Sequence, residues 1–301
     1  MASPLEAAAS DKPPRSTAKN FRSILIGRLF SALSIWLALV ALTKMTDPAT
    51  VGLYALAQAI CIPIAEVSKM SLREIRSADT ESEFLFGDYM GMRLLATLVG
   101  FVLMVFAGLV QSETAAMLAV IVLYGLARCC ELISDMIYGL FQAHERMEYI
   151  GWSLCILGPT SLAMLVTGYW LTGSLVVAVA GQLLAHIAVL SLYDIPLGRV
   201  RASARGDTFQ PRWRFSALSS LVRRAVPLTF ATVLIIIALY FPRVTVEYEL
   251  GLTGLGLFAA IFALAMAPDR LVNALGIATE TCDTLVSDRS NKMWRDARLP
   301  R

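Results

Sequence analysis

The chain has 301 residues, of which 57% are hydrophobic and 16% are charged, and its formal net charge at pH 7 is +3. A soluble domain carries about 25% charged residues, so this composition excludes an ordinary soluble protein. Apolar runs of about 20 residues, the length that a helix needs to span a bilayer, recur along the chain. The sequence therefore predicts an all-α integral membrane protein.

Eight apolar runs are long enough to be transmembrane helices. The bilayer core offers no water to the backbone, so each run must satisfy its own N–H and C=O groups as a helix. The runs are too long and too uniformly apolar for the alternating strands of a membrane barrel. In chain order the predicted spans are Phe21–Leu42, Val51–Lys69, Phe84–Val110, Thr114–Phe141, Ile150–Leu171, Ser174–Tyr193, Val226–Phe241 and Leu252–Leu275.

Polar stretches around these spans divide the chain into five predicted regions. The first 20 residues are rich in Ala, Ser and Pro, a composition typical of a disordered tail. The longest connecting segment, 194–224, carries seven arginines. The predicted regions are a disordered cytoplasmic tail (1–20), a six-helix N-terminal lobe (21–193), a basic cytoplasmic loop (194–224), the first two helices of a C-terminal lobe (225–277) and a polar cytoplasmic tail (278–301).

The distribution of Lys and Arg predicts the orientation in the membrane. Basic residues gather in cytoplasmic loops, and here both tails and the even-numbered loops are basic, whereas the odd-numbered loops are nearly bare. Both termini are therefore expected in the cytoplasm. The small positive excess is expected to serve this topology and contact with anionic membrane lipids, not binding of nucleic acid.

Two segments of the chain resemble each other. The second span opens with Val51–Ala55 (VGLYA) and the eighth with Leu255–Ala259 (LGLFA), and a proline follows each, Pro63 or Pro268. The predicted spans place both segments in the same direction through the bilayer, which indicates a parallel duplication of six-helix lobes. The second lobe would then have two of its six helices, as in a truncated product. Chance similarity between two apolar segments is the alternative.

The fourth span carries the main functional candidates, because an ionisable residue at membrane depth is costly unless it has a partner or a role. Glu131 and Asp135 follow Arg128 by three and seven residues, so all three lie within one arc of a helix. Two interpretations remain open. The residues line a substrate or ion pathway inside the bundle, or Arg128 and Glu131 form an internally neutralised pair that fixes helix packing.

Three further arginines lie at or near membrane depth. Arg28 lies in the first span, Arg93 lies in the third, and Arg243 follows Pro242 at the outer end of the seventh. Long basic side chains near a helix end can extend to the membrane surface. We expect Arg93 to reach the cytoplasmic surface in this way.

The sequence lacks the signatures of enzymes and metal sites. It has two histidines, His144 and His186, and contains no H-E-x-x-H zinc motif, no phosphate-binding loop and no nucleophile elbow. The cysteines lack metal-ligand spacing and are expected to be small packing residues. We therefore expect no enzymatic activity, no cofactor and no bound metal.

Four stretches of the sequence, in their order and spacing, resemble a known family. They span most of Phe21–Ile277 and are similar to the O-antigen type of polysaccharide biosynthesis flippase, within the multidrug/oligosaccharidyl-lipid/polysaccharide (MOP) exporter superfamily. The stretches are Gly27–Ser31 with Val51–Tyr54 and Leu72-Arg73, Glu131–Gly139 with Gln142, Ala225–Leu228 with Pro242-Arg243, and Leu255–Ala260.

This resemblance implies two six-helix bundles around a central cavity in a bacterial inner membrane. It implies passage of an undecaprenyl-diphosphate-linked oligosaccharide to the periplasmic leaflet by alternating access, with a glycan polymerase and glycosyltransferases as candidate partners. Guanidinium groups bind phosphate bidentately, so the expected substrate-binding residues are Arg28, Arg128 and Arg243. The expected ion-coupling residues are Glu131 and Asp135. Family members have about twelve helices, whereas this chain ends after eight.

Other functions remain open from the sequence alone. A drug or cation exporter of the same superfamily would favour acidic residues in its cavity, and Arg128 argues against that class. A truncated remnant without transport, or a membrane scaffold for glycan-assembly enzymes, would suit the abrupt polar C-terminal tail. Drug-resistance assays and neighbouring genes for glycosyltransferases would distinguish these readings.

Overall fold

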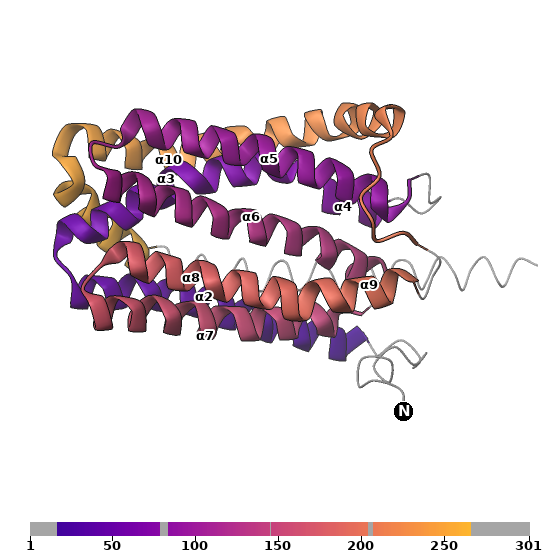
Figure 1. Cartoon of the computed structure of the whole chain (residues 1–301), viewed down its shortest axis with the longest axis horizontal. Helices are drawn as coiled ribbons and strands as arrows, with labels where there is room; N and C mark the ends of the chain where they lie inside the picture. The colour runs from indigo at the N-terminus through magenta and orange to yellow at the C-terminus, as the bar shows by residue number, and fades with distance from the viewer. Residues whose placement is uncertain (1–16, 79–83, 145, 204–206, 266–301) are drawn as a thin grey trace, which may run out of the picture.

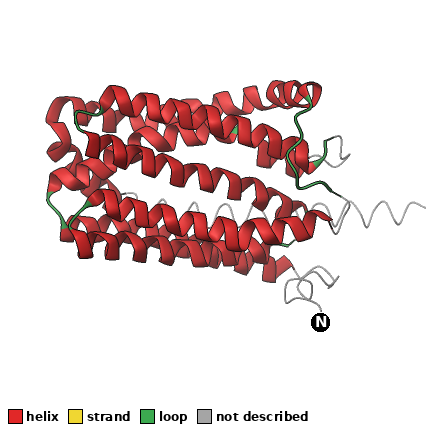
Figure 2. Cartoon of the chain, viewed as in Figure 1, coloured by secondary structure: helices red, strands yellow, loops and turns green. Residues whose placement is uncertain are grey.

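A computed structural model describes residues 17–78, 84–144, 146–203 and 207–265, and every regular element in these ranges is a helix (Figures 1 and 2). The predicted all-α fold is confirmed. The expected tail at 278–301 and most of the one at 1–20 lie outside the described residues. In chain order the elements are α2 (Thr17–Met45), α3 (Pro48–Lys69), α4 (Leu72–Ala78), α5 (Phe86–Gln111), α6 (Ala115–Ala143), α7 (Met147–Thr172), α8 (Leu175–Val189), the π-helical turn η1 (Leu190–Asp194), α9 (Ile195–Ser203) and α10 (Phe215–Ala265).

The first six predicted spans correspond to α2, α3, α5, α6, α7 and α8. The sixth does not end at Tyr193, because the helix continues through η1 and α9 to Ser203, and the expected loop begins only there. The seventh and eighth predicted spans run together in α10, and the eighth is described only to Ala265. Among the described residues six helices are long and apolar enough to cross a membrane, and the bent helix α10 would make a seventh.

Two breaks shape α10. The helix bends by 52° between Phe215–Pro227 and Thr232–Phe262. Gly251 has φ 66° and ψ −173°, a conformation outside the helical region that favours glycine, so the section from Leu252 onward is a second helix joined to the first. The chain can therefore turn back at Gly251 and pack Leu252–Ala265 against the rest of the bundle (Figure 1).

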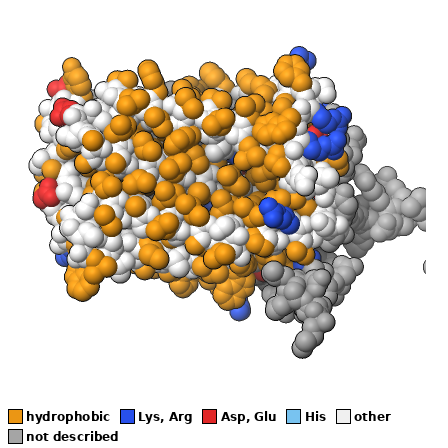
Figure 3. Space-filling view, viewed as in Figure 1, with side chains coloured by type: hydrophobic (Ala, Val, Ile, Leu, Met, Phe, Trp, Pro, Cys, Tyr) orange, Lys and Arg blue, Asp and Glu red, His pale blue; other side chains and the backbone are white. Residues whose placement is uncertain are grey.

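The surface of the bundle is a broad apolar band between two charged rims (Figure 3). On α5, for example, Leu98, Val102, Phe106 and Val110 are all exposed, as expected for side chains that face lipid. We call one rim the acidic end; it carries the short loops and the residues Asp47, Glu113, Glu247 and Glu249. The other rim, the basic end, carries α4, α9 and the residues Arg199, Arg201, Arg212 and Arg214.

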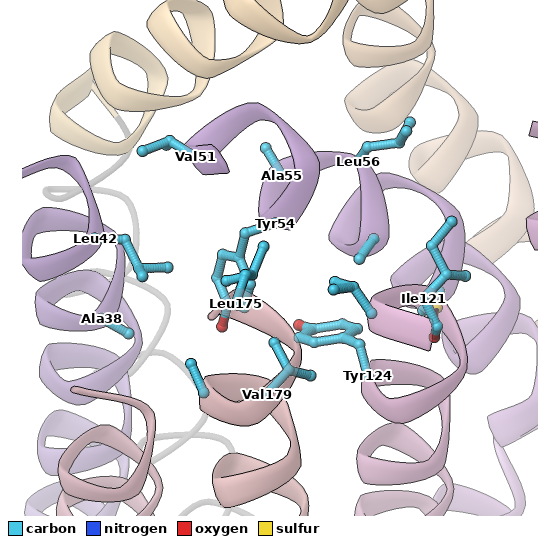
Figure 4. Packing of buried hydrophobic residues seen from close by; sticks show 14 of the residues in the cluster. Ala38, Leu42, Val51, Tyr54, Ala55, Leu56, Ile121, Tyr124, Leu175 and Val179 are labelled. Carbon is cyan, nitrogen blue, oxygen red and sulfur yellow. Dashed lines mark hydrogen bonds between the residues drawn. The ribbon is translucent and has the colours of Figure 1, made fainter. Parts of the chain in front are cut away.

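The interior contains two main apolar clusters. The cluster toward the acidic end joins α2, α3, α6, α8 and α10, and includes Leu42, Val51, Tyr54, Tyr124 and Val179 (Figure 4). The cluster toward the basic end joins α4, α5, α6, α7, η1, α9 and α10 and contains no buried residue of α2 or α3. There, Ile24 of α2 forms a separate small cluster with Met147. The first half of α2 therefore does not share the core that holds the other helices together.

Small residues join α2 to α7 along their length. A Cβ atom added at Gly27 would lie 2.7 Å from the carbonyl oxygen of Gly151, and one added at Gly158 would lie 2.8 Å from Oγ of Ser34. Small residues let two helix backbones approach closely inside a membrane. These two helices therefore form one tightly packed pair.

The segment that precedes α10 is fixed to the basic end. Asp207 accepts hydrogen bonds from Nη2 of Arg76 at 2.9 Å and from the backbone N–H of Phe86 at 3.0 Å. Arg212 donates its backbone N–H to the carbonyl oxygen of Gly87 at 2.9 Å. A Cβ atom at Gly87 would overlap the carbonyl oxygen of Gln210, so the close approach needs a glycine. Residues 207–212, which we call the strap, thus hold the segment before α10 against α4 and α5.

Candidate functional site

The three ionisable residues of α6 all have partners. Nη1 of Arg128 lies 2.6 Å from Oε2 of Glu131, and the guanidinium carbon of Arg128 lies 5.2 Å from the centre of the Tyr124 ring. The structure thus contains the neutralised Arg128–Glu131 pair that the sequence left open. The side chain of Glu131 keeps 38% of its surface exposed, so this pair also borders accessible space.

Asp135 does not pair with Arg128. It accepts hydrogen bonds from Nη1 of Arg73 at 3.3 Å and from Nη2 of Arg93 at 3.0 Å. Arg73 also donates from Nε to Gln142 at 3.1 Å. Three elements meet here, because Arg73 comes from α4, Arg93 from α5 and Asp135 from α6. One carboxylate therefore holds two guanidinium groups from different helices.

The position of Arg93 differs from the sequence-based expectation. Its side chain does not reach the surface: it is 0% exposed and faces Asp135. A nearby carboxylate deep in the bundle offers a better partner than the more distant membrane surface. Nε and Nη1 of Arg93 are buried and have no hydrogen-bond partner among the described residues. The same holds for Nε of Arg28.

Together these groups form what we call the charge cluster. Arg28 lies within electrostatic range of Arg73, Glu131 and Asp135, and Nζ of Lys69 pairs with Glu66 at 2.6 Å. These groups have five basic and three acidic side chains, and a fourth carboxylate, Glu74, also lies within electrostatic range of Arg93, which leaves an excess of one positive charge. Among the described residues several N–H groups of the cluster have no partner. The arrangement can therefore accept an anionic group with several oxygen atoms. Its members are Arg28, Lys69, Arg73, Arg93, Arg128, Glu66, Glu131 and Asp135.

The charge cluster lies beside the apolar cluster toward the basic end, since Arg93 and Asp135 are next in the chain to its members Met92 and Met136. The buried residues of α2 do not belong to that apolar cluster, and Arg28 projects from α2. The side chains of Lys69 and Glu66 are about one third exposed, so the cluster is accessible from the basic end.

Arg243, the third expected substrate-binding residue, lies elsewhere. Its guanidinium carbon is 4.9 Å from the ring centres of both Tyr240 and Phe262. It lines a cavity of about 20 Å³ together with Trp36 and Gln58, which is room for one water molecule. The structure therefore brings Arg28 and Arg128 into one cluster and places Arg243 beside a separate small cavity.

A second buried carboxylate, Asp194, was not a candidate from the sequence. It is 0% exposed and accepts hydrogen bonds from Ser134 at 2.6 Å and Ser153 at 2.8 Å. The hydroxyl groups of Ser153 and Tyr138 lie 2.7 Å apart. Sequence reasoning placed Asp194 at the start of a loop; the signal for its burial was the apolar run that continues on either side of it. It lies in η1, and π-helical turns are frequent at functional sites.

The described residues contain no group of three or more His, Cys, Asp or Glu side chains that could hold a metal ion. His186 points its Nδ1 at the carbonyl oxygen of Gln182, 2.9 Å away. The chemistry that the described site offers is therefore ionic and hydrogen-bonding recognition.

Comparison with known proteins identifies related sequences. Residues 17–279 match the family model described as polysaccharide biosynthesis protein. The capsular polysaccharide biosynthesis protein CapF of Staphylococcus aureus is 22% identical over 243 residues, which cover 81% of this chain and 60% of that protein. The chain thus spans about three fifths of the length of this relative.

Solved structures show a similar fold. A MOP-superfamily transporter from Pyrococcus furiosus aligns with a TM-score of 0.56 and 13% identity, covering 94% of this chain and 66% of its own. An outward-facing multidrug resistance transporter of the MATE family, in the same superfamily, aligns with a TM-score of 0.57 and 13% identity, covering 94% and 67%. At this identity the likeness concerns the fold alone.

Proposed function

Since the chain belongs to the polysaccharide biosynthesis protein family and has the fold of MOP-superfamily transporters, we propose that it is a membrane transporter component for polysaccharide export. Its substrate is an undecaprenyl-diphosphate-linked oligosaccharide. The charge cluster binds the diphosphate while the prenyl chain stays in lipid, and the head group crosses the bacterial inner membrane by alternating access. Both termini and the basic end face the cytoplasm, because basic residues favour that side.

The observation that carries this proposal is the surplus of guanidinium donors in the charge cluster. A buried charge without a partner is costly, yet Arg93 is fully buried and two of its nitrogens have no partner in the part of the chain that the structure describes. A diphosphate diester is a dianion, and the cluster has more positive than negative charges even when Glu74 beside Arg93 is counted. Arginine forks fit phosphate oxygens with paired hydrogen bonds.

Asp135 has a defined part in this proposal. It occupies the guanidinium groups of Arg73 and Arg93 when no substrate is bound. A phosphate that takes its place releases the carboxylate, which can then accept a coupling proton. Glu131, which pairs with Arg128, is proposed to be released and to accept a proton in the same manner. Arg243 is proposed to meet the glycan only after the head group has left the cluster, because it lines a small cavity away from the cluster.

Direct binding tests the proposal without requiring transport. The purified chain in lipid nanodiscs is titrated with undecaprenyl diphosphate, undecaprenyl phosphate and undecaprenol. We expect the diphosphate to bind most tightly, and Arg73→Ala to weaken its binding about tenfold or more, since a charged hydrogen bond contributes about 1.5–3 kcal/mol. Arg214→Ala, which removes an exposed arginine at the same end, is the matched control and should leave binding unchanged.

Two outcomes would contradict the proposal. Equal affinity for undecaprenol would show that only the prenyl chain is recognised. A loss in Arg214→Ala as large as in Arg73→Ala would show that general positive charge is responsible. A surface-glycan complementation assay then tests transport, where Arg128→Ala should abolish glycan display while the protein still inserts into the membrane.

A further inference from the structure

Arg128 is held in the charge cluster in a different way from Arg73 and Arg93. Those two arginines donate hydrogen bonds to Asp135 at 3.3 and 3.0 Å. Nη1 of Arg128 lies 2.6 Å from Oε2 of Glu131, yet that oxygen has no hydrogen-bond partner among the described residues, and neither has Nε of Arg128. A hydrogen bond needs an N–H that points at its acceptor. The Arg128–Glu131 pair is therefore an ionic contact without a directed hydrogen bond.

An aromatic ring holds the guanidinium group of Arg128 in place. The guanidinium carbon lies 5.2 Å from the centre of the Tyr124 ring, one turn earlier in α6. A cation at this distance over a ring face is attracted to the ring, and more strongly where water is excluded. The side chain of Arg128 is 15% exposed, so little water weakens the contact. The attraction uses the charge of the guanidinium group and occupies none of its N–H donors.

The Tyr124 ring is itself fixed by three helices. It is buried in the apolar cluster toward the acidic end. The ring of Tyr54 in α3 meets it edge to face, with ring centres 5.7 Å apart and an angle of 85° between the planes (Figure 4), which is a favoured arrangement of aromatic pairs. The hydroxyl group of Tyr54 donates in turn to Oε1 of Gln182 in α8 at 3.3 Å. Tyr124 therefore offers Arg128 a ring face of fixed orientation.

We propose that Tyr124 is a positioning residue for the lipid-linked substrate: its ring holds the guanidinium group of Arg128 so that the N–H donors meet the phosphate oxygens. The inference rests on the proposed function and deepens it. A flexible arginine loses side-chain freedom when it binds a ligand, and a guanidinium group that is already fixed loses less. A phosphate can also bind the donors of Arg128 without first displacing a hydrogen-bonded carboxylate, unlike those of Arg73 and Arg93.

Two substitutions at position 124 separate the ring face from the rest of the side chain. The full chain in lipid nanodiscs is titrated with undecaprenyl diphosphate and with undecaprenol. Tyr124→Phe keeps a ring face that attracts a cation, so its affinity for the diphosphate should stay within about twofold of the native value. Tyr124→Leu should weaken diphosphate binding about tenfold, which corresponds to about 1.4 kcal/mol. Neither variant should change the affinity for undecaprenol, which carries no phosphate.

A double-mutant cycle tests whether Tyr124 acts through Arg128. In an Arg128→Ala background, Tyr124→Leu should change diphosphate affinity by less than about twofold, because the ring then has no guanidinium group to hold. A loss of the same size in both backgrounds would overturn the positioning role. Tyr149→Leu is the matched control, since it removes a ring that lies 5.2 Å from the guanidinium carbon of Arg201, outside the charge cluster. It should leave diphosphate binding unchanged, and a loss equal to that of Tyr124→Leu would also overturn the role.

A second variant keeps the shape of the ring, in case Tyr124→Leu prevents insertion. Trifluorinated phenylalanine at position 124 packs much like phenylalanine but has a less negative ring face. It should bind the diphosphate about fivefold more weakly than Tyr124→Phe. Equal affinity of the native chain for the diphosphate and undecaprenol would refute the proposed function, and this inference with it. A native preference for the diphosphate that fluorination leaves unchanged would refute the role of Tyr124 alone.

Discussion

The two halves of the bundle are closed in different ways. Toward the acidic end, α2, α3, α6, α8 and α10 share one apolar cluster, and glycines bring α3 and α10 into backbone contact. Toward the basic end a second apolar cluster joins α4, α5, α6, α7, α9 and α10, α2 is separate from it, and buried ion pairs lie beside it. Both halves therefore have an apolar core, and only the half toward the basic end adds a cluster of buried charges among the described residues. We call that half the charged half and the other the apolar half, and their difference predicts different costs for removing a charged and an apolar side chain.

The largest effect that we expect breaks the charged half. Asp135→Ala leaves Arg73 and Arg93 without their common carboxylate, and Arg93 is fully buried. Removing one partner of a buried ion pair costs about 3–5 kcal/mol. Titration with sodium dodecyl sulfate in mixed micelles, followed by circular dichroism, measures the free energy of unfolding. The double variant Asp135→Ala/Arg93→Leu should recover part of the loss. A change below about 1 kcal/mol in the single variant would refute the assigned pairing.

A smaller effect is expected in the apolar half. Leu42 of α2 is 1% exposed within the cluster near the acidic end. Leu42→Ala should cost about 2 kcal/mol, the low end of the range for a buried leucine, because membrane helices associate without the hydrophobic effect. The same unfolding titration measures it at low and high salt. The loss in free energy of unfolding caused by Leu42→Ala should be the same at low and high salt. A loss that changes with salt would contradict a purely apolar role for Leu42.

The smallest effect concerns the N-terminus of α3. Asp47 caps α3 by accepting a hydrogen bond from the N–H of Thr50 at 3.1 Å, and Asp47→Ala should cost about 1 kcal/mol. A hydrogen bond from the Thr50 hydroxyl holds the pKa of Asp47 below its ordinary value. The unfolded chain therefore binds this proton more readily, and the stabilisation is present above the ordinary pKa of about 3.9 and lost as pH falls through the lower folded value.

Melting temperatures in detergent check this sign. The difference between the native chain and Asp47→Ala should be largest near neutral pH and should shrink in acid. Thr43→Ala, which removes a hydroxyl bonded to its own helix, is a control that should show no such dependence on pH. A difference that stays constant or grows in acid would exclude a role for the Asp47 carboxylate in capping.

Much of the helical fold could be predicted from the sequence because its signals are local. A long apolar run needs no distant partner to indicate a helix in a membrane. The ends of the helices were less predictable. No polar gap separates α8 from η1 and α9, so the sequence did not predict that this helix continues beyond Tyr193. The boundary between the last two spans is a single residue, because Gly251 turns the chain without a loop.

In the candidate site, the contact within one helix could also be predicted from the sequence, and the contacts between helices could not. The Arg128–Glu131 pair follows from spacing along one helix, and it was foreseen as one of two readings. The pairing of Asp135 with Arg73 and Arg93 joins three elements, which no spacing can indicate. Asp194 was missed for the same reason, since its hydroxyl partners Ser134 and Ser153 come from α6 and α7. Local spacing indicates which helix carries charge, and tertiary packing decides what the charge meets.

The strap fixes only the first part of α10. Asp207 and Arg212 anchor the chain to α4 and α5 just before Phe215. From there α10 runs about 20 Å to Pro227, bends by 52° before Thr232 and continues for about 30 Å to Gly251, at about 1.5 Å per residue. A change in the angle of this bend would therefore move the far end of α10 while its anchored end stays in place.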